Sequence, residues 1–184
     1  MLLTPLPTFK LVLFVVENEM ILVEAITQAQ LSLFKEIRLR ALKDAPYAFG
    51  STYVREAHFA DVDWMQRILW WNGELGIGFL AMDDEQVCGI AGCLLEPEDT
   101  TRAQLVSMWT APSHRQRGVG RLLVEAVLAW ANSKGVPALN LMVTSNNHSA
   151  MVFYERLGFV STGRTEPFPN DPAVTECEMS RPTS

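Results

Sequence analysis

Residues 105–122 read LVSMWTAPSHRQRGVGRL, and this stretch indicates how the rest of the chain is arranged. The apolar run over 105–109 predicts a buried strand, which Pro112 ends, and a helical pattern follows the turn. The turn is basic and contains Gly118 and Gly120. Backbone N–H groups at a helix start favour an anion, and glycines let the backbone approach it closely. The turn is therefore predicted to bind a phosphate.

The spacing of the glycines decides between known kinds of phosphate site. A Walker loop requires Lys-Ser/Thr after the last glycine, but Gly120 is followed by Arg121. A dinucleotide-binding turn requires a third glycine where this chain has Leu123. The remaining pattern, Arg115-x-x-Gly118-x-Gly120, resembles the pyrophosphate loop of the GNAT family of N-acetyltransferases. By itself the pattern is equally typical of an ordinary strand–helix turn with solvent-facing arginines.

A second motif strengthens the resemblance. Residues 147–159, NHSAMVFYERLGF, match the family pattern Asn-x-x-Ala-x-x-x-Tyr-x-x-x-Gly-Phe at every fixed position. The motif follows a predicted strand at the family's usual distance after the phosphate loop. The resemblance covers roughly residues 20–179, which is nearly the whole chain.

Composition and charge exclude several classes of protein. A chain of 184 residues with 48% hydrophobic content fits one domain, which we place at 20–184, after an N-terminal extension over 1–19. The apolar runs are shorter than a membrane helix requires, and the extension lacks a signal-peptide cleavage site, so we expect a cytoplasmic protein without a membrane partner. A net charge of −6 argues against nucleic-acid binding. Residues 100–124 nevertheless contain four arginines and no acid, which favours an anionic ligand there.

Cysteine and histidine usage gives no sign of a metal or a disulfide. Three cysteines fit a reducing compartment. Cys88 and Cys93 have odd spacing in one predicted strand, so we expect them to face opposite sides and remain unpaired. The three histidines are scattered, and we expect no metal.

The hydrophobic patterns predict a mixed α/β fold. We expect a first strand from Met20, a helix over 31–42 and a second helix from Asp61 to Trp71. Further strands are predicted at 77–82, 87–95, 102–110, 138–143, 159–163 and 174–179, with helices after Gly120 and over 147–157. The apolar segment 11–16 has no evident strand partner, and Pro167, Pro169 and Pro172 indicate a loop. Most strands are expected to be antiparallel, with one parallel strand–helix–strand unit over 102–143.

The resemblance implies a GNAT-type central mixed sheet with flanking helices and splayed central strands. It also implies acetyl-coenzyme A as cosubstrate, with direct attack of an amine on the thioester. The implied cofactor-binding residues are Met108, Trp109, Thr110, Arg115, Gln116, Arg117, Gly118, Val119, Gly120, Arg121 and Asn147. Asn147 would meet the pantetheine arm, cap its helix, or do both. Tyr154 matches the family's general acid, although orientation of the thioester is an alternative role because a thiolate leaves readily.

The general base and the acceptor stay open at this stage. Some relatives carry a glutamate on the strand before the loop, but residues 104–108 have no carboxylate, and Glu24, Glu96, Glu98 or Asp99 could act through water. The turn over 47–50 and the helix over 64–71 are expected to wall the acceptor site. We expect an N-acetyltransferase acting on a primary amine of a small molecule or peptide. The alternatives are a catalytically weak coenzyme A-binding sensor or interaction module, or a transferase with a different acyl donor or an oxygen acceptor. Whether the chain forms a homodimer is open.

Overall fold

The computed structural model describes residues 12–16 and 19–184, with side chains from residue 20 onward. The strands are β1 (Val12–Val16), β2 (Glu19–Ala25), β3 (Gly76–Asp83), β4 (Gln86–Glu96), β5 (Asp99–Thr110), β6 (Ala138–Thr144), β7 (Val160–Phe168) and β8 (Asp171–Pro182). The helices are α1 (Leu31–Asp44), α2 (Tyr53–Ala57), α3 (Asp61–Trp71), α4 (Val119–Ser133) and α5 (His148–Arg156). Short 3₁₀ turns are η1 (Gln28–Gln30), η2 (Pro46–Ala48) and η3 (Pro112–His114).

The strands form one mixed sheet in the order β1-β2-β3-β4-β5-β6-β8-β7. All neighbouring pairs are antiparallel except β5 and β6, which are parallel. The parallel pair is joined through α4, as a strand–helix–strand unit requires. This arrangement confirms the expected mixed, largely antiparallel sheet with flanking helices.

Two buried clusters lie on opposite faces of the sheet. One joins α1 and α3 to the sheet through side chains such as Phe34, Trp64 and Leu80, which are fully buried. The other packs α4 and α5 against the other face, with Leu123 and Phe159 among its members. The 3.6-residue apolar stripe of each helix produces this arrangement, because each helix buries one face against the sheet.

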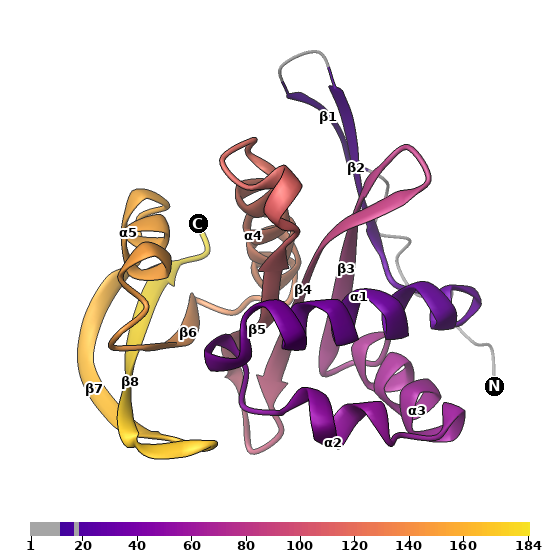
Figure 1. Cartoon of the computed structure of the whole chain (residues 1–184). Helices are drawn as coiled ribbons and strands as arrows, with labels where there is room; N and C mark the ends of the chain where they lie inside the picture. The colour runs from indigo at the N-terminus through magenta and orange to yellow at the C-terminus, as the bar shows by residue number, and fades with distance from the viewer. Residues whose placement is uncertain (1–11, 17–18) are drawn as a thin grey trace, which may run out of the picture.

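The sheet opens at its centre. β5 pairs with β6 at three successive positions, from Arg102 opposite Ala138 to Gln104 opposite Asn140, and the pairing stops there. In the same region the β4–β5 register shifts, so that Ile90 faces Trp109 but Gly92 faces Val106. This β-bulge gives β5 an extra residue and bends it. Figure 1 shows β5 and β6 diverging, with β6, β7, β8 and α5 leaning away from the rest of the sheet. The expected splayed strands are confirmed.

Several local expectations were wrong. The segment 11–16 does have a strand partner, because Val12–Val16 pairs antiparallel with β2. Pro167 and Pro172 lie within β7 and β8, which are joined by a tight hairpin turn at residues 169–170. Proline is tolerated at position 167 because β7 is an edge strand of the sheet. The short helix α2 was not predicted, because five residues carry too little periodicity.

The two strand cysteines also depart from the expected pattern. Cys88 and Cys93 both belong to the buried cluster formed with α4, although their odd spacing predicts opposite faces. The β3–β4 register shifts between Ala81 and Met82, which leaves Cys88 as the extra residue of a second bulge and breaks the strict alternation. The expectation that they do not pair is confirmed, since both thiols are free. Burial raises the pKa of each thiol to about 12.

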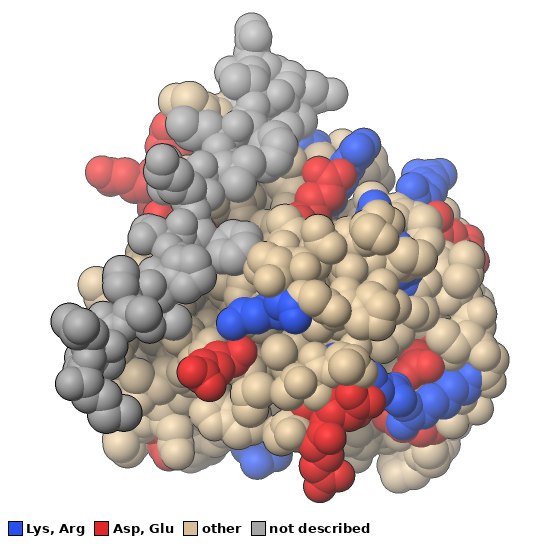
Figure 2. Space-filling view, turned by 180° about the vertical axis from the view of Figure 1, so that it is seen from behind, with Lys and Arg blue, Asp and Glu red and all other residues tan. Residues whose placement is uncertain are grey.

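Charged groups are distributed without a broad patch of one sign on the face seen in Figure 2. There, Lys and Arg side chains alternate with Asp and Glu among a majority of other residues. Within the described residues, no helix is long and apolar enough to cross a membrane.

Candidate functional site

The opening of the sheet leads into a large cavity of about 1830 Å³. Ligand pockets for small molecules are usually about 300–1,000 Å³, so this cavity has room for two ligands side by side. One part of it is lined by β5, β6 and the turn before α4, and another by η2, α3, β7 and β8. Ten of the twelve residues named from the sequence as site residues line it; Arg117 and Val119 are the two that do not.

The turn before α4 exposes a set of backbone donors. Gln116 and Gly118 both adopt left-handed backbone conformations, with φ of 63° and 79°. The first α-helical hydrogen bond of α4 runs from the Leu122 N–H to the Gly118 carbonyl. Within the described residues, the N–H groups of Gly118, Val119 and Gly120 therefore donate no hydrogen bond to the protein. These donors and the helix dipole make an anion-binding cradle.

Gly120 lies in a tight part of this cradle. A Cβ at this position would be 3.1 Å from Phe153 Cζ and 3.2 Å from Met108 Cε, which is closer than ordinary van der Waals contact. The absence of a side chain therefore keeps the cradle open between β5 and α5. Val119 contributes its backbone alone, because its side chain is fully buried in the core.

The three arginines of the turn each have partners within the protein. Arg115 forms an ion pair with Asp44 and donates from Nε to the Thr110 carbonyl at 3.1 Å. Arg117 donates to the Ser113 carbonyl at 3.2 Å. Arg121, which is exposed, pairs with Glu125 one helical turn later at 2.7 Å.

These contacts show which of the three arginines can still meet a ligand and which help to stabilise the turn. Arg115 and Arg121 line the cavity, so both remain candidates for an anionic ligand. The contacts of Arg115 also stabilise the turn, because Asp44 is the last residue of α1. Asp44 in addition accepts a hydrogen bond from the indole of Trp109 at 2.8 Å, and this ties α1 to the end of β5.

The strand β5 presents mainly its backbone to the opening. Trp109 is buried in the α1-side cluster, so its side chain is a core residue, and Met108 is partly buried. Thr110 has a buried hydroxyl without a hydrogen-bond partner among the described residues, and it lines the cavity. Beyond Gln104 the backbone groups of β5 that face β6 are not paired with it, so a ligand in the opening can use them.

Asn147 and Tyr154 approach the opening from α5. Asn147 caps this helix, because its Oδ1 accepts a hydrogen bond from the Ala150 N–H at 3.2 Å. Tyr154 is buried against Phe153 and Phe159, at ring-centroid distances of 5.2 and 5.6 Å. Burial raises the pKa of the Tyr154 phenol, so the hydroxyl stays protonated and can donate a hydrogen bond. Both residues line the cavity.

The expected aromatic walls are present in part. Tyr47, Phe49 and Trp70 line the cavity, and Tyr47 and Trp70 are largely exposed. Trp64 is instead a core residue, because it is fully buried and packs edge-on against Phe34 at 5.6 Å. The α3 helix therefore contributes to the cavity through one side, and to the core through the other.

A buried ion-pair network lies behind this wall, and the sequence did not reveal it. Glu56 is fully buried and accepts hydrogen bonds from Arg38 at 2.8 and 3.0 Å, while Arg67 approaches it to 2.9 Å. Burial by itself would raise the pKa of Glu56. The hydrogen bonds and charge of Arg38, with the charge of Arg67, outweigh burial and hold that pKa below its ordinary value.

The network reaches the bulge of β5. Arg38 also donates from Nη1 to Ser107 Oγ at 3.1 Å. Ser107 has a φ of 56°, a conformation that residues other than glycine rarely adopt. Arg38 thus bonds the strained residue that bends β5 away from β6. Its guanidinium also lies over the Phe49 ring at 4.7 Å.

The carboxylates that line the cavity are not those considered from the sequence. Glu24, Glu96, Glu98 and Asp99 lie elsewhere, whereas Asp63, Glu166 and Glu176 line it. A signal was present in residues 174–179, where acidic and less polar residues alternate along a strand. The pattern could not tell which strand face meets the cavity. Among the described residues, no group of three or more His, Cys, Asp or Glu side chains is arranged to hold a metal ion.

Comparisons with known proteins agree with this geometry. The model of the acetyltransferase (GNAT) family matches residues 39–159. Human N-acetyltransferase 8 is 31% identical over 90 residues, which are 47% of this chain and 40% of the human protein. The [ribosomal protein bS18]-alanine N-acetyltransferase of Salmonella typhimurium is 28% identical over 97 residues, which are 52% of this chain and 64% of that enzyme. The matches thus cover less than two thirds of these curated relatives.

Solved structures share the fold over most of the chain. A GNAT-family acetyltransferase from Streptococcus pneumoniae has a TM-score of 0.72 at 18% identity, covering 88% of this chain and 98% of the other. Nourseothricin acetyltransferase has a TM-score of 0.56 at 27% identity, covering 60% of this chain and 67% of its own. The family match spans more than half of the chain and includes the glycine turn, the opened strands and α5. The chain therefore belongs to the GNAT acetyltransferase family.

Proposed function

We propose that this protein is an acetyl-coenzyme A-dependent N-acetyltransferase that acetylates a primary amine of a small molecule or peptide. The proposal rests on one observation above all. The pairing of β5 with β6 ends at Gln104, and the opening beyond it leads to the unpaired N–H groups at the start of α4. This arrangement offers backbone hydrogen bonds to an extended arm and a cradle to its anionic end, which are the two needs of a pantetheine pyrophosphate.

The residues then divide the work of acyl transfer. Acetyl-coenzyme A supplies the activated acetyl group as a thioester. The N–H groups of Gly118 to Gly120 bind the pyrophosphate, with Arg115 or Arg121 adding charge-assisted bonds. The free backbone of β5 beyond Gln104 binds the arm and can polarise the thioester carbonyl. Asn147 supports the arm from the start of α5.

Tyr154 completes this side of the site. Its raised pKa makes full proton transfer to a departing thiolate unfavourable, because a thiol is much the stronger acid. A neutral phenol can still donate a hydrogen bond to the sulfur as negative charge develops there. We assign Tyr154 this role, which holds the sulfur in place and stabilises the leaving thiolate.

The test of this function has two steps. Ligand at 100 times its Kd stabilises a protein by about 2.7 kcal/mol, which corresponds to a rise in melting temperature of roughly 5–10 °C for a chain of this size. Acetyl-coenzyme A should produce such a rise, and a panel of primary amines should then give thiol release. Stabilisation without turnover on any amine would favour a coenzyme A sensor. A melting temperature that acetyl-coenzyme A leaves unchanged would contradict both functions.

A further inference from the structure

Two acidic side chains form a pair on the cavity wall opposite the network of Arg38. Glu166 on β7 and Glu176 on β8 are directly opposite each other in the strand register. On its other side Glu176 is opposite Thr144 of β6. Cross-strand neighbours point to the same sheet face with Cβ atoms about 4.5–5.5 Å apart. All three residues line the cavity, so this face is turned toward the ligand space.

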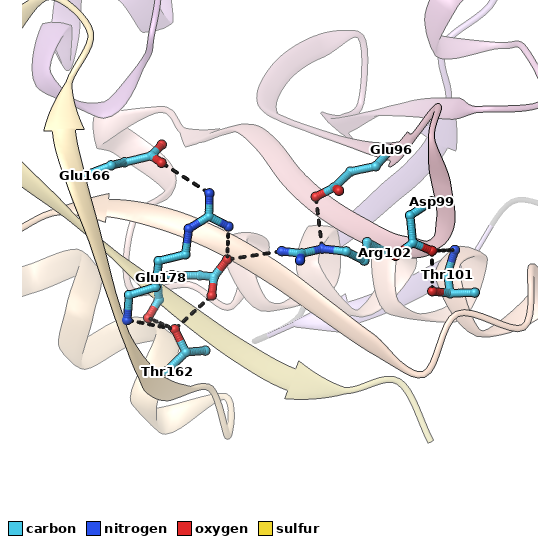
Figure 3. Close-up of polar contacts among 8 residues, drawn as sticks. Glu96, Asp99, Thr101, Arg102, Thr162, Glu166 and Glu178 are labelled. Carbon is cyan, nitrogen blue, oxygen red and sulfur yellow. Dashed lines mark hydrogen bonds and ion pairs between the residues drawn. The ribbon is translucent and has the colours of Figure 1, made fainter.

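The acids of β7 and β8 differ in their partners. Glu178 accepts hydrogen bonds from Thr162 at 2.8 Å and Arg164 at 3.2 Å, and Arg102 lies 3.6 Å away. Figure 3 shows these contacts, which join β5, β7 and β8. Glu166 pairs with Arg164 at 3.4 Å. These two acids therefore have neutralising partners within the fold.

Glu176 is different. It is half-buried, yet within residues 20–184 its side-chain carboxylate forms no hydrogen bond or ion pair. Burial, and next the charge of Glu166, raise the pKa of Glu176. Charged or titratable groups also line the cavity from other elements: Tyr47 from η2, His148 and Arg156 from α5, and Arg38, Asp63 and Arg67 from the opposite wall. A half-buried carboxylate without a partner in a ligand cavity is a candidate for function, since its desolvation is otherwise uncompensated.

The position of Glu176 suits the acceptor and not the cofactor. β8 is the strand beyond β6, so Glu176 is separated from the β5–β6 opening by Thr144. The Thr144 hydroxyl donates to the Tyr47 carbonyl at 3.3 Å, which brings the aromatic turn η2 over the same place. The exposed Tyr47 ring also lies 6.5 Å from that of Phe168. The cavity is thus lined by an acid and by the aromatic Tyr47, a combination that suits an organic cation.

We propose that Glu176, with Glu166 beside it, binds the ammonium group of the acceptor and is the general base that deprotonates it. The inference rests on the proposed acetyltransferase function and names its substrate class: a primary amine that is cationic at neutral pH. Asp63, the third acid that lines the cavity, already has a structural partner, because its carboxylate accepts a hydrogen bond from the N–H of Ala60, the N-cap residue of α3, at 2.8 Å.

The proton and electron balance is complete without further groups. One proton passes from the ammonium nitrogen to the Glu176 carboxylate, and the freed electron pair on nitrogen forms the bond to the thioester carbon. The carbon–sulfur bond then breaks, and its electron pair leaves with sulfur. A second proton leaves the nitrogen and is taken up by the departing thiolate, which becomes the thiol, while the proton on Glu176 returns to solvent. The products are an amide, free coenzyme A and one proton.

The decisive comparison is Glu176→Gln against wild type, with Glu98→Gln as the control. Glu98 is an exposed acid in the turn between β4 and β5. An arylamine, which is neutral at pH 7, is compared with an alkylammonium acceptor from the amine panel. We expect Glu176→Gln to bind acetyl-coenzyme A as wild type does but to lose about 10²–10⁴-fold in kcat/KM for the alkylammonium acceptor. The arylamine should lose much less, because it needs no deprotonation before attack.

The pH profile separates a base from a structural role. In wild type, kcat/KM should rise with pH as Glu176 loses its proton, and that rise should disappear in Glu176→Gln. Glu166→Gln removes the neighbouring negative charge, so the rise should shift to lower pH, with a higher KM for cationic acceptors. Alkylammonium turnover by Glu176→Gln within twofold of wild type, with the acid limb unchanged, would overturn the inference alone. Cofactor binding without wild-type turnover on any amine would overturn the proposed function and this inference together.

Discussion

Replacing Glu56 by glutamine should strongly destabilise the protein. Glu56 is fully buried and its carboxylate receives the hydrogen bonds of Arg38, which is itself 4% exposed. Glutamine keeps the shape but removes the charge, and so leaves a buried cation without its counter-ion. Breaking a buried ion pair from one side costs about 3–5 kcal/mol, out of a total stability of about 5–15 kcal/mol for a typical domain. We expect a loss of this size in the free energy of unfolding.

Urea unfolding at pH 7, followed by circular dichroism, measures this loss. Glu98→Gln is the matched control, since it removes an exposed carboxylate, and it should stay within about 0.5 kcal/mol of wild type. A double variant, Arg38→Met with Glu56→Leu, replaces both charges by apolar groups and should recover much of the stability. If Glu56→Gln loses less than about 1 kcal/mol, the network is hydrated and the reasoning fails.

The stability difference between wild type and Glu56→Gln should also depend on pH. The pKa of Glu56 is lower in the folded protein than its ordinary value of 4.5. A depressed carboxyl pKa contributes stability above the unfolded-state pKa, and this contribution is lost as pH falls through the folded-state pKa. The stability difference between wild type and Glu56→Gln should therefore be largest near neutral pH and shrink below about pH 4.5. A constant difference from pH 7 to pH 3 would contradict the assignment.

Three further predictions concern the site and the chain start. Gly120→Val should raise the Kd for acetyl-coenzyme A, measured by calorimetry, at least tenfold, and should cost about 1–3 kcal/mol of stability, because the valine side chain would meet Phe153 and Met108. An unchanged Kd would refute the assignment of this turn as the pyrophosphate site. Tyr154→Phe should lower turnover about tenfold or more in a thiol-release assay and leave cofactor affinity near wild type, whereas normal turnover would make the hydroxyl structural. Deleting residues 1–19 should preserve folding and cofactor binding, since in the described part of the sheet β1 is an edge strand next to β2; a lost melting transition would contradict this prediction.

The elements around the glycine turn could be predicted because their signals are local. Leu105, Pro112 and Gly118 fall in one short stretch, and each acts through its own backbone or its near neighbours. The structure has the strand, the turn and the helix where those residues predict them. Asn147 likewise caps its helix, because capping needs a side chain and a backbone group three residues apart.

Predictions that depended on strand phase were less secure. The expectation that Cys88 and Cys93 face opposite sides of the sheet was wrong, because a bulge changed the alternation along β4. No residue type in the sequence indicates such a bulge. No strand partner was evident for the segment 11–16, but Val12–Val16 pairs with β2 in the structure. Sequence could not show this pairing, since it depends on which edge of the sheet is free. Such errors follow from a period of two residues, where a single insertion reverses every side chain beyond it.

The sequence by itself indicated the family, the glycine turn, and the strand and helix on either side of that turn. Each of these signals comes from residues that are contiguous in the chain. The tertiary structure alone brought together Arg38 and Glu56 behind the bulge at Ser107, and placed Glu166 and Glu176 on one cavity wall. Those groupings depend on strand register and helix packing between distant segments. Spacing along a chain carries no information about which face of a strand or helix will meet a cavity that other segments enclose.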